Sequence, residues 1–455
     1  MKEYLKLNRI TVALRGTAIF FDRWHWILLA LAAPFLLFPS PSRSLALFVV
    51  PGLWLLAWLA GREPLPRTPL NAALLLMFCM VLVSLWATYD VAVSLPAISG
   101  SVLGLGVYYA FVRLGQQRRG WWMSLTFFLI AVVGLAVIGL FGIRWINKVG
   151  FLSPIILRIP PLLVGLPGVD EGLHPNEVAG GLLWGIGLWW CLTLALIRNW
   201  NVARGWSWKF ILSVVTLAAS LFVTGVFVLT QSRGGYIGLA LTLPVLILIA
   251  LPPKWRWRGL TILALLAMIL GVLLASRWEA ARTWVTGSDL ASDPALSLIT
   301  LEGRMEIWSR AIYGIQDFPF TGMGMNTFHK VVTALYPLFT ISSEYDIGHA
   351  HNEFLQAALD LGVPGLIAFI ALYLGAFWML FQVWRDRSSQ ILSVTGVFSH
   401  RWLAVGLGSG LLAHLLYSLT DAIPLGSKYG LLFWMLLALI TGLYEQIRSN
   451  RVLRV

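Results

Sequence analysis

Runs of about twenty apolar residues recur along this chain, and they restrict it to a narrow class of folds. Of its 455 residues, 58% are hydrophobic and only 12% are charged, whereas a soluble domain carries about 25% charged residues. A bilayer core about 30 Å thick needs about 20 apolar residues for each helix that crosses it. The sequence therefore predicts an all-α polytopic membrane protein embedded in a lipid bilayer. With no internal repeat and no low-complexity linker, we expect one domain over residues 1–455.

Twelve membrane-spanning helices are predicted from these runs. They cover residues 24–38, 44–60, 72–89, 92–115, 122–141, 178–197, 209–230, 234–251, 259–276, 362–384, 402–420 and 430–447. Cys79 and Cys191 each lie inside an apolar run. We expect both to be small buried hydrophobic residues, with no disulfide and no thiolate metal site.

Basic residues gather in every second connection, and this pattern predicts the orientation of the chain. With the N-terminus inside, the inner connections hold Arg62, Arg67, Arg113, Arg118, Arg119, Arg198, Arg204, Lys209, Lys254, Arg256, Arg258, Arg385, Arg387, Arg401, Arg448, Arg451 and Arg454. Both termini are then cytoplasmic. The net charge of +13 reflects membrane orientation, so we expect no nucleic-acid partner. Residues 1–23 are expected to form a basic amphipathic segment on the anionic inner leaflet, with no cleavable signal peptide; a disordered basic tail is the alternative.

Two outer connections are longer than the rest. Residues 142–177 are apolar and rich in proline before the stretch DEGLHPNE, and we expect them to lie partly in the membrane interface. Residues 277–361 form the largest polar segment, an outer-face loop with twice as many acidic as basic residues. Within it, Met305, Trp308, Ile312 and Ile315 have the spacing of one helical face.

Two arginines on the outer side are candidates for binding phosphate. Arg233 lies between glycines where the seventh and eighth predicted spans meet. A guanidinium offers a planar fork of donors to phosphate oxygens, and glycine lets a ligand approach the backbone. The alternative for Arg233 is an interfacial side chain that reaches up to lipid headgroups. Arg304 lies between Glu302 and Glu306, so an ion pair on a helix surface is its alternative.

His351 is the candidate general base. A neutral imidazole titrates near ambient pH and can take a proton from a hydroxyl group. Glu353 or Asp360 is predicted to orient its ring. His349 precedes it by two residues, so both rings should lie on one side of an extended segment, and a metal site there is an alternative. Local capping of the following helix is another.

Other polar residues are assigned supporting or structural roles. His174 and Asn176 fit the start of a helix at the outer surface, where a contact with substrate is the alternative. Asp421 is expected at the membrane interface and His414 as a packed, hydrogen-bonded side chain. His329 has no convincing context.

Three stretches together resemble the O-antigen ligase and O-antigen polymerase family of bacterial envelope glycosyltransferases. They are LTQSRGGYIGL, GRMEIWSRAIYGIQDFPFTGMGMNTF, and His351–Asn352 followed at a spacing of nine residues by Gly362 and of two by Gly365. The stretch HPNEVAG at 174–180 is similar to the family's entry into a helix. Trp308 departs from the family pattern, which has leucine four residues after the arginine.

The resemblance implies a metal-independent glycosyltransferase with a GT-C-like membrane fold and no cofactor. It would use a polyprenyl (undecaprenyl) diphosphate-linked glycan as donor and act on the outer face of the bacterial cytoplasmic membrane, as in lipopolysaccharide biosynthesis. Carried over by position, Arg233 and Arg304 would bind the diphosphate and His351 would activate an acceptor hydroxyl on a glycan or lipid-glycan. A Wzy-like polymerase and a protein O-glycosyltransferase remain alternatives. A transporter of small solutes or bicarbonate is the alternative of another class.

Overall fold

The structure is a computed structural model. It describes residues 15–20, 24–145, 150–166, 169–199, 208–277, 279, 283, 300–342, 344–386 and 398–452. The regular structure within these residues is helical, and the one β-bridge among them is a parallel bridge between Ile143 and Leu173. The predicted all-α membrane fold is therefore confirmed. Most of the predicted basic segment 1–23 lies outside the described residues.

Each of the twelve predicted ranges contains a helix. These helices are α2 (His25–Leu37), η1 (Pro41–Phe48) with α3 (Val49–Leu59), α4 (Asn71–Ala87), α5 (Val91–Gly115), α6 (Arg118–Gly142), α8 (Pro175–Arg198), α9 (Trp208–Leu229), α10 (Arg233–Ala250), α11 (Pro253–Ser276), α15 (Glu353–Arg385), α16 (His400–Tyr417) and α17 (Leu431–Val452). Among the described residues, eight helical segments are long and apolar enough to cross a membrane. Twelve crossings stay a prediction.

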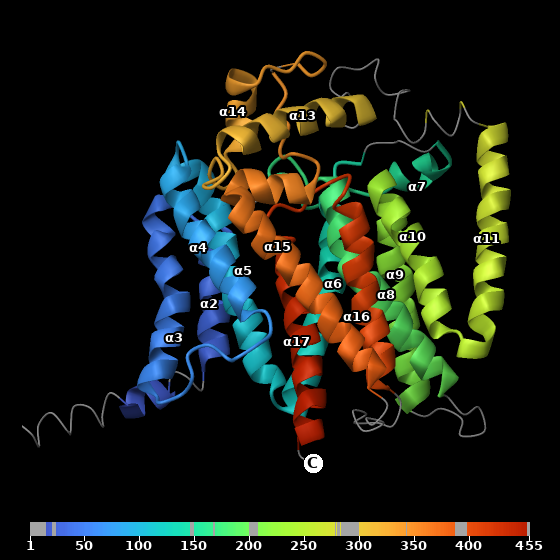
Figure 1. Cartoon of the computed structure of the whole chain (residues 1–455), viewed down its shortest axis with the longest axis horizontal. Coiled ribbons are helices and arrows are strands. Elements are labelled where there is room, and N and C mark those ends of the chain that lie inside the picture. The colour runs from blue at the N-terminus through green and yellow to red at the C-terminus, as the bar shows by residue number, and fades with distance from the viewer. Residues whose placement is uncertain are drawn as a thin grey trace, which may run out of the picture.

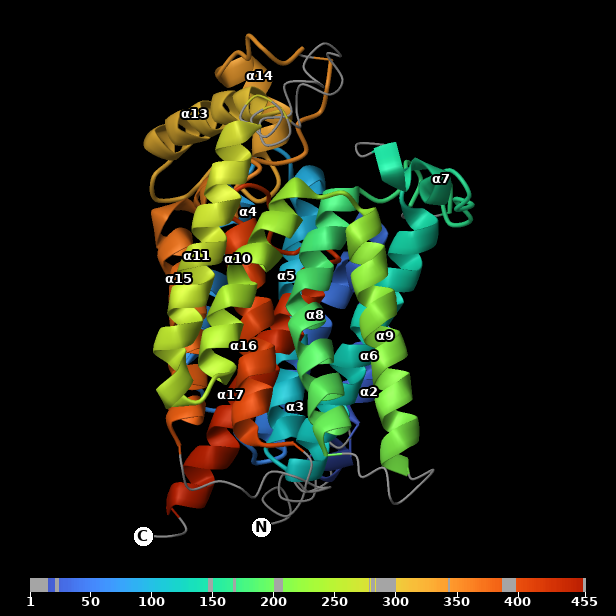
Figure 2. The same cartoon turned by 90° about the vertical axis from the view of Figure 1, so that its right-hand side faces the viewer.

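The helix bundle has two chemically different ends. Three further helices lie at one end, which we call the α13 end: α7 (Ser153–Ile156), α13 (Leu301–Asp317) and α14 (Phe328–Leu335) (Figure 1). The opposite end, which we call the basic end, carries the connections from α5 to α6 and from α10 to α11, and α15 ends and α16 begins there (Figures 1 and 2). Arginines that the orientation rule assigns to the cytoplasm lie in the helix ends here, among them Arg118 and Arg119 of α6 and Arg256 and Arg258 of α11. The sidedness itself stays a prediction.

The centre of the bundle depends on close approach between α8 and α16. A side chain at Gly410 would place its Cβ 2.1 Å from the carbonyl oxygen of Trp184, and one at Gly187 would meet the Ser409 hydroxyl at 1.9 Å. Small residues permit such contacts in membranes, where apolar lipid tails compete with apolar side chains for the helix surface. Cys191 is buried here as predicted, but Cys79 is exposed on the outside of α4. The expectation that both cysteines are buried was therefore wrong for Cys79, because its side chain lies on the exposed face of α4.

A break at Gly362 divides α15 and positions its outer end. Gly362 has φ 68° and ψ 179°, a conformation that favours glycine. Its backbone lies against the α13–α14 connection, where the Val363 N–H donates to Pro319 O (2.7 Å) and the Met323 N–H donates to Leu359 O (2.7 Å). The tenth predicted span begins at residue 362, which is the position of this break. The short helical piece before it leads to His351.

The described part of the large outer segment has a small core of its own. It includes Ile307, Ala311, Phe328, Val332 and Leu359. The helix predicted from the spacing of Met305, Trp308, Ile312 and Ile315 is present as α13, although Met305 and Ile312 are 58% and 46% exposed. The inward face instead follows Ile307, Ala311 and Gly314, a set in which small residues allow α13 to lie close to α15.

Candidate functional site

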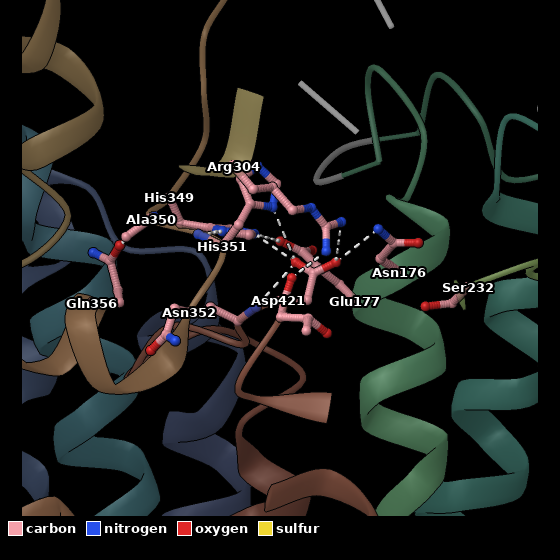
Figure 3. A network of polar contacts seen from close by, with 12 residues as sticks. Asn176, Glu177, Ser232, Arg304, His349, Ala350, His351, Asn352, Gln356 and Asp421 are labelled. Atoms are coloured by element: carbon pink, nitrogen blue, oxygen red, sulfur yellow. Dashed lines mark hydrogen bonds and ion pairs between the residues drawn. The ribbon is translucent and has the colours of Figure 1, made fainter. Parts of the chain in front are cut away.

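The buried carboxylate of Asp421 joins three segments at the α13 end (Figure 3). Asp421 follows α16 and is 1% exposed. Its Oδ2 accepts hydrogen bonds from Asn176 Nδ2 at 2.7 Å and from Arg304 Nη2 at 3.3 Å. Its Oδ1 lies 3.2 Å from His351 Nδ1. We call Asn176, Arg304, His349, His351 and Asp421 the Asp421 cluster.

The backbone around His351 is held in an unusual conformation. His351 has φ 47°, in the left-handed region that few non-glycine residues adopt. Its N–H donates to His349 Nδ1 at 3.1 Å, and its carbonyl accepts a hydrogen bond from Trp308 Nε1 at 3.3 Å. A leucine at position 308 could not donate that bond. The next residue, Asn352, caps α15 by accepting from two backbone N–H groups and donates to Leu419 O at 3.1 Å.

The contact with Asp421 fixes the proton arrangement on the His351 ring. An ionised carboxylate only accepts hydrogen bonds, so Nδ1 must carry the proton in this pair. Nε2 then has the free lone pair. No described residue bonds to Nε2. This is the tautomer that a general base needs if it is to act through Nε2.

The charge state of Asp421 follows from its neighbours. Burial alone would favour its neutral form, but the Arg304 guanidinium and the adjacent His351 hold the pKa of the Asp421 carboxyl well below its usual range. His349 behaves differently, because burial and then the neighbouring His351 lower the pKa of its ring well below the ordinary value. The cluster therefore contains an ionised carboxylate and a neutral His349 at neutral pH.

His349 completes a triad of groups with the geometry of a metal site. The His349 and His351 rings lie with centroids 4.4 Å apart, on one side of the segment as predicted. His349 Nε2 is 3.8 Å from Asp421 Oδ1 and 3.9 Å from Glu177 Oε1. Together His349, His351 and Asp421 offer three ligand atoms within 4.8 Å of one another. Arg304 already neutralises the Asp421 carboxylate, which disfavours a second cation there.

Arg304 reaches the cluster from the first turn of α13. Thr300 caps this helix by accepting from the Gly303 N–H at 3.1 Å. Arg304 Nη1 donates to the carbonyl of Thr420, so its two terminal nitrogens clasp the segment after α16. Its Nε is buried without a hydrogen-bond partner among the described residues, and so is Oδ1 of Asn176. One unused donor and one unused acceptor thus flank Asp421.

Arg233 is the first residue of α10 and lies at the same end. Ser232 caps α10 by accepting from the Gly235 N–H at 3.3 Å. A Cβ at Gly234 would lie 2.7 Å from the Thr420 hydroxyl, so α10 begins directly against the segment that leads to Asp421. The glycines after Arg233 therefore allow close helix packing, and Arg233 itself is half-buried.

The acidic partner predicted for His351 was wrong. Glu353 Oε2 instead accepts from His414 Nε2 at 2.9 Å and from the Ser418 hydroxyl at 2.6 Å. Asp360 Oδ1 accepts from the Asn326 N–H at 3.0 Å and from Gln356 Nε2 at 2.9 Å. Asp421 contacts the ring, although the sequence indicated only an interfacial role for it. The one available signal was an acid in an apolar stretch, SLTDAIPLG, on the predicted outer side.

The remaining candidates have defined positions. His174 precedes α8 without a side-chain capping bond, and Pro175 opens that helix as expected. His414 is fully buried, as expected. His329 lies outside the cluster, with Nδ1 2.7 Å from Asp346. The alternative predicted for Arg304 was an ion pair with Glu302 or Glu306. Arg304 instead pairs with Asp421 at 3.3 Å.

Part of this chain matches a known protein family. Residues 218–370 match the family model described as O-antigen ligase. The match begins in α9 and ends inside α15, so it includes Arg233, Arg304 and His351 but neither Asn176 nor Asp421. No curated protein matches the chain.

Proposed function

We propose that this chain, whose residues 218–370 match the family model described as O-antigen ligase, is a membrane glycosyltransferase that acts on a lipid-linked glycan. The donor in this proposal is a polyprenyl (undecaprenyl) diphosphate glycan, and the acceptor is a hydroxyl group at the outer face of the bacterial cytoplasmic membrane. One observation carries the proposal. The carboxylate of Asp421 contacts His351 Nδ1 on one side and the Arg304 guanidinium on the other.

His351 acts as the general base in this reaction. With its Nδ1 proton directed at Asp421, its Nε2 accepts the proton of the acceptor hydroxyl. The acceptor oxygen bonds to the anomeric carbon as the bond from that carbon to the diphosphate oxygen breaks. The electron pair leaves with the diphosphate, and a single displacement inverts the configuration. Asp421 then stabilises the imidazolium that forms on His351.

Arg304 and Arg233 stabilise the leaving diphosphate. Charge develops on the phosphate oxygens as the glycosyl bond breaks, and preorganised cations lower the barrier most when water is excluded. The free Nε of Arg304 supplies a donor, while the free Oδ1 of Asn176 suits a sugar hydroxyl. Three residues have supporting roles in this proposal and act neither as the base nor as a phosphate ligand: His349, His174 and Glu353. With guanidinium groups in this position, the proposed reaction requires no metal ion.

The distribution of buried ionisable groups favours transfer over transport. Among the described residues, His349, His351, Glu353, His414 and Asp421 are buried close together at the α13 end. A transporter places such groups near the middle of the membrane, on broken helices. Here they gather where a lipid-linked substrate would present its polar head.

In vitro transfer with the purified full chain tests the proposal. The donor is a polyprenyl diphosphate glycan, and the acceptors are a lipid A-core glycolipid, a second lipid-linked glycan and a serine-containing peptide. Product on one acceptor distinguishes a ligase, a polymerase and a protein O-glycosyltransferase. We expect His351→Ala to abolish transfer while donor binding is retained, and His329→Ala, the matched control, to remain active.

Two outcomes would contradict parts of the proposal. Undiminished turnover by His351→Ala would remove the general base. Loss of activity with a chelator, restored by a divalent cation, would replace the metal-independent reaction with one that uses His349, His351 and Asp421 as ligands.

A further inference from the structure

Residues of α6, α8 and α9 line a groove at the basic end. This end of the three helices is opposite the α13 end, where the Asp421 cluster lies (Figure 2). Its volume is about 790 Å³. Its walls are formed by Arg118, Arg119, Trp122, Leu125, Thr126, Leu129, Leu192, Leu196, Leu212, Thr216 and Phe398. The two arginines are consecutive at the start of α6, and the remaining lining is almost entirely apolar. The groove thus has a cationic mouth and an apolar interior.

The polar groups of this groove are available to a ligand. Arg118 and Arg119 are exposed. Trp122 Nε1 is a buried donor without a hydrogen-bond partner among the described residues, although its ring packs against Phe398 at 5.6 Å between centroids. The hydroxyls of Thr126 and Thr216 are already bonded to backbone carbonyls of their own helices. The unused capacity of the groove is therefore donor capacity, which suits an anion.

We propose that this groove binds an anionic phospholipid, with the phosphate on Arg118 and Arg119 and one acyl chain between α6, α8 and α9. Free phosphate could bind the arginines, but it would leave the apolar walls of the groove without an apolar ligand. An uncharged lipid could fill the groove, but it would leave the arginines without an anion. Basic pockets between membrane helices on the cytoplasmic side are a known mode of binding anionic headgroups. The walls open toward lipid, because α6 and α9 both carry exposed apolar residues such as Phe127 and Ile211.

Native mass spectrometry of the detergent-solubilised full chain, titrated with phosphatidylglycerol or phosphatidylcholine, measures this binding. We expect tight binding of phosphatidylglycerol only. The Arg118→Gln/Arg119→Gln variant should bind it roughly 25-fold more weakly, since each basic residue near an anionic lipid contributes about a five-fold factor. Arg118 also borders a second, more polar hollow with Arg67 and Glu445, so the single variant Arg119→Gln isolates this groove.

Two further variants make the test specific. Arg258→Gln removes the same charge at the basic end, on α11, and should bind like the wild type. Leu212→Trp fills the groove from a partly exposed position on α9 and should weaken binding without a change in charge. Transfer activity of each variant reports that the fold is intact. Equal binding of both lipids, equal loss in Arg258→Gln, unchanged binding in Leu212→Trp, or competition by inorganic phosphate at millimolar concentration would each overturn the proposal.

Discussion

His351 Nδ1 lies 3.2 Å from Asp421 Oδ1, although 70 residues separate the two along the chain. The pair joins the segment before α15 to the segment after α16. Because Arg304 bonds the other carboxylate oxygen, the base and the cation of the proposed reaction are held by one side chain. Four predictions follow from this arrangement and from the packing that supports it.

Replacing Asp421 with Asn should lower the transfer rate by about 10²- to 10⁴-fold. The amide can donate to Nδ1 and thereby favour the opposite tautomer, which leaves no lone pair on Nε2. Initial rates at saturating donor measure the effect. The matched control is Asp346→Asn, which removes a carboxylate bound to His329 outside the cluster. A rate for Asp421→Asn within threefold of the wild type would show that the contact does not position the base.

Replacing Arg304 with Lys should lower kcat/KM for the donor by about 10- to 100-fold. The ammonium group of lysine keeps the charge at position 304. It cannot bond to both Thr420 O and Asp421 and still offer a further donor to the diphosphate. Steady-state kinetics with varied donor give this value. Arg310→Lys, on the same helix but paired with Glu306 at 3.6 Å, should behave as the wild type. Equal effects of the two substitutions would argue against a specific role for Arg304.

The stability of the protein should depend on the charge of Asp421 in a defined direction. Since its folded-state pKa lies well below the ordinary value, its contribution is fully present above about pH 4 and is lost as the pH falls through the folded-state pKa. Breaking this buried pair should cost about 3–5 kcal/mol. Asp421→Asn should therefore show a lower Tm by a constant amount from pH 5 to 8, as followed by tryptophan fluorescence. A difference that vanished between pH 8 and pH 6 would mean that Asp421 is protonated in the folded state.

Replacing Gly362 with Ala should destabilise the outer end of α15. The residue has φ 68°, and a Cβ would lie 2.4 Å from Phe320 O, a backbone atom that cannot turn away. The conformation alone costs about 1–3 kcal/mol for a non-glycine residue. We expect a lower Tm and reduced transfer, because His351 is carried by this segment. Gly225→Ala in α9, where a Cβ meets nothing within 4 Å, should leave both unchanged; equal losses in the two variants would point to a general effect.

Local sequence signals predicted the features that depend only on neighbouring residues. The start of the tenth predicted span at residue 362 coincides with the Gly362 break, and Pro175 opens α8 as expected. The spacing of Met305, Trp308, Ile312 and Ile315 likewise predicted a helix, and α13 is that helix. Which face of α13 points inward was not predicted, because Gly314 and Ala311 face inward through being small enough for α15 to approach.

The sequence by itself determined that this is a helical membrane protein, where most helices lie, and which end of the bundle is basic. These properties follow from hydropathy and charge, which each segment carries alone. Only the tertiary structure decided that Glu353 pairs with His414 and that Asp421 contacts His351. Both acids lie near helix ends, and their partners depend on how α8, α13, α15 and α16 pack together. Contacts between side chains far apart in the chain depend on how closely these helices pack. Glycines permit that close packing, and it brings side chains of different helices within hydrogen-bonding distance.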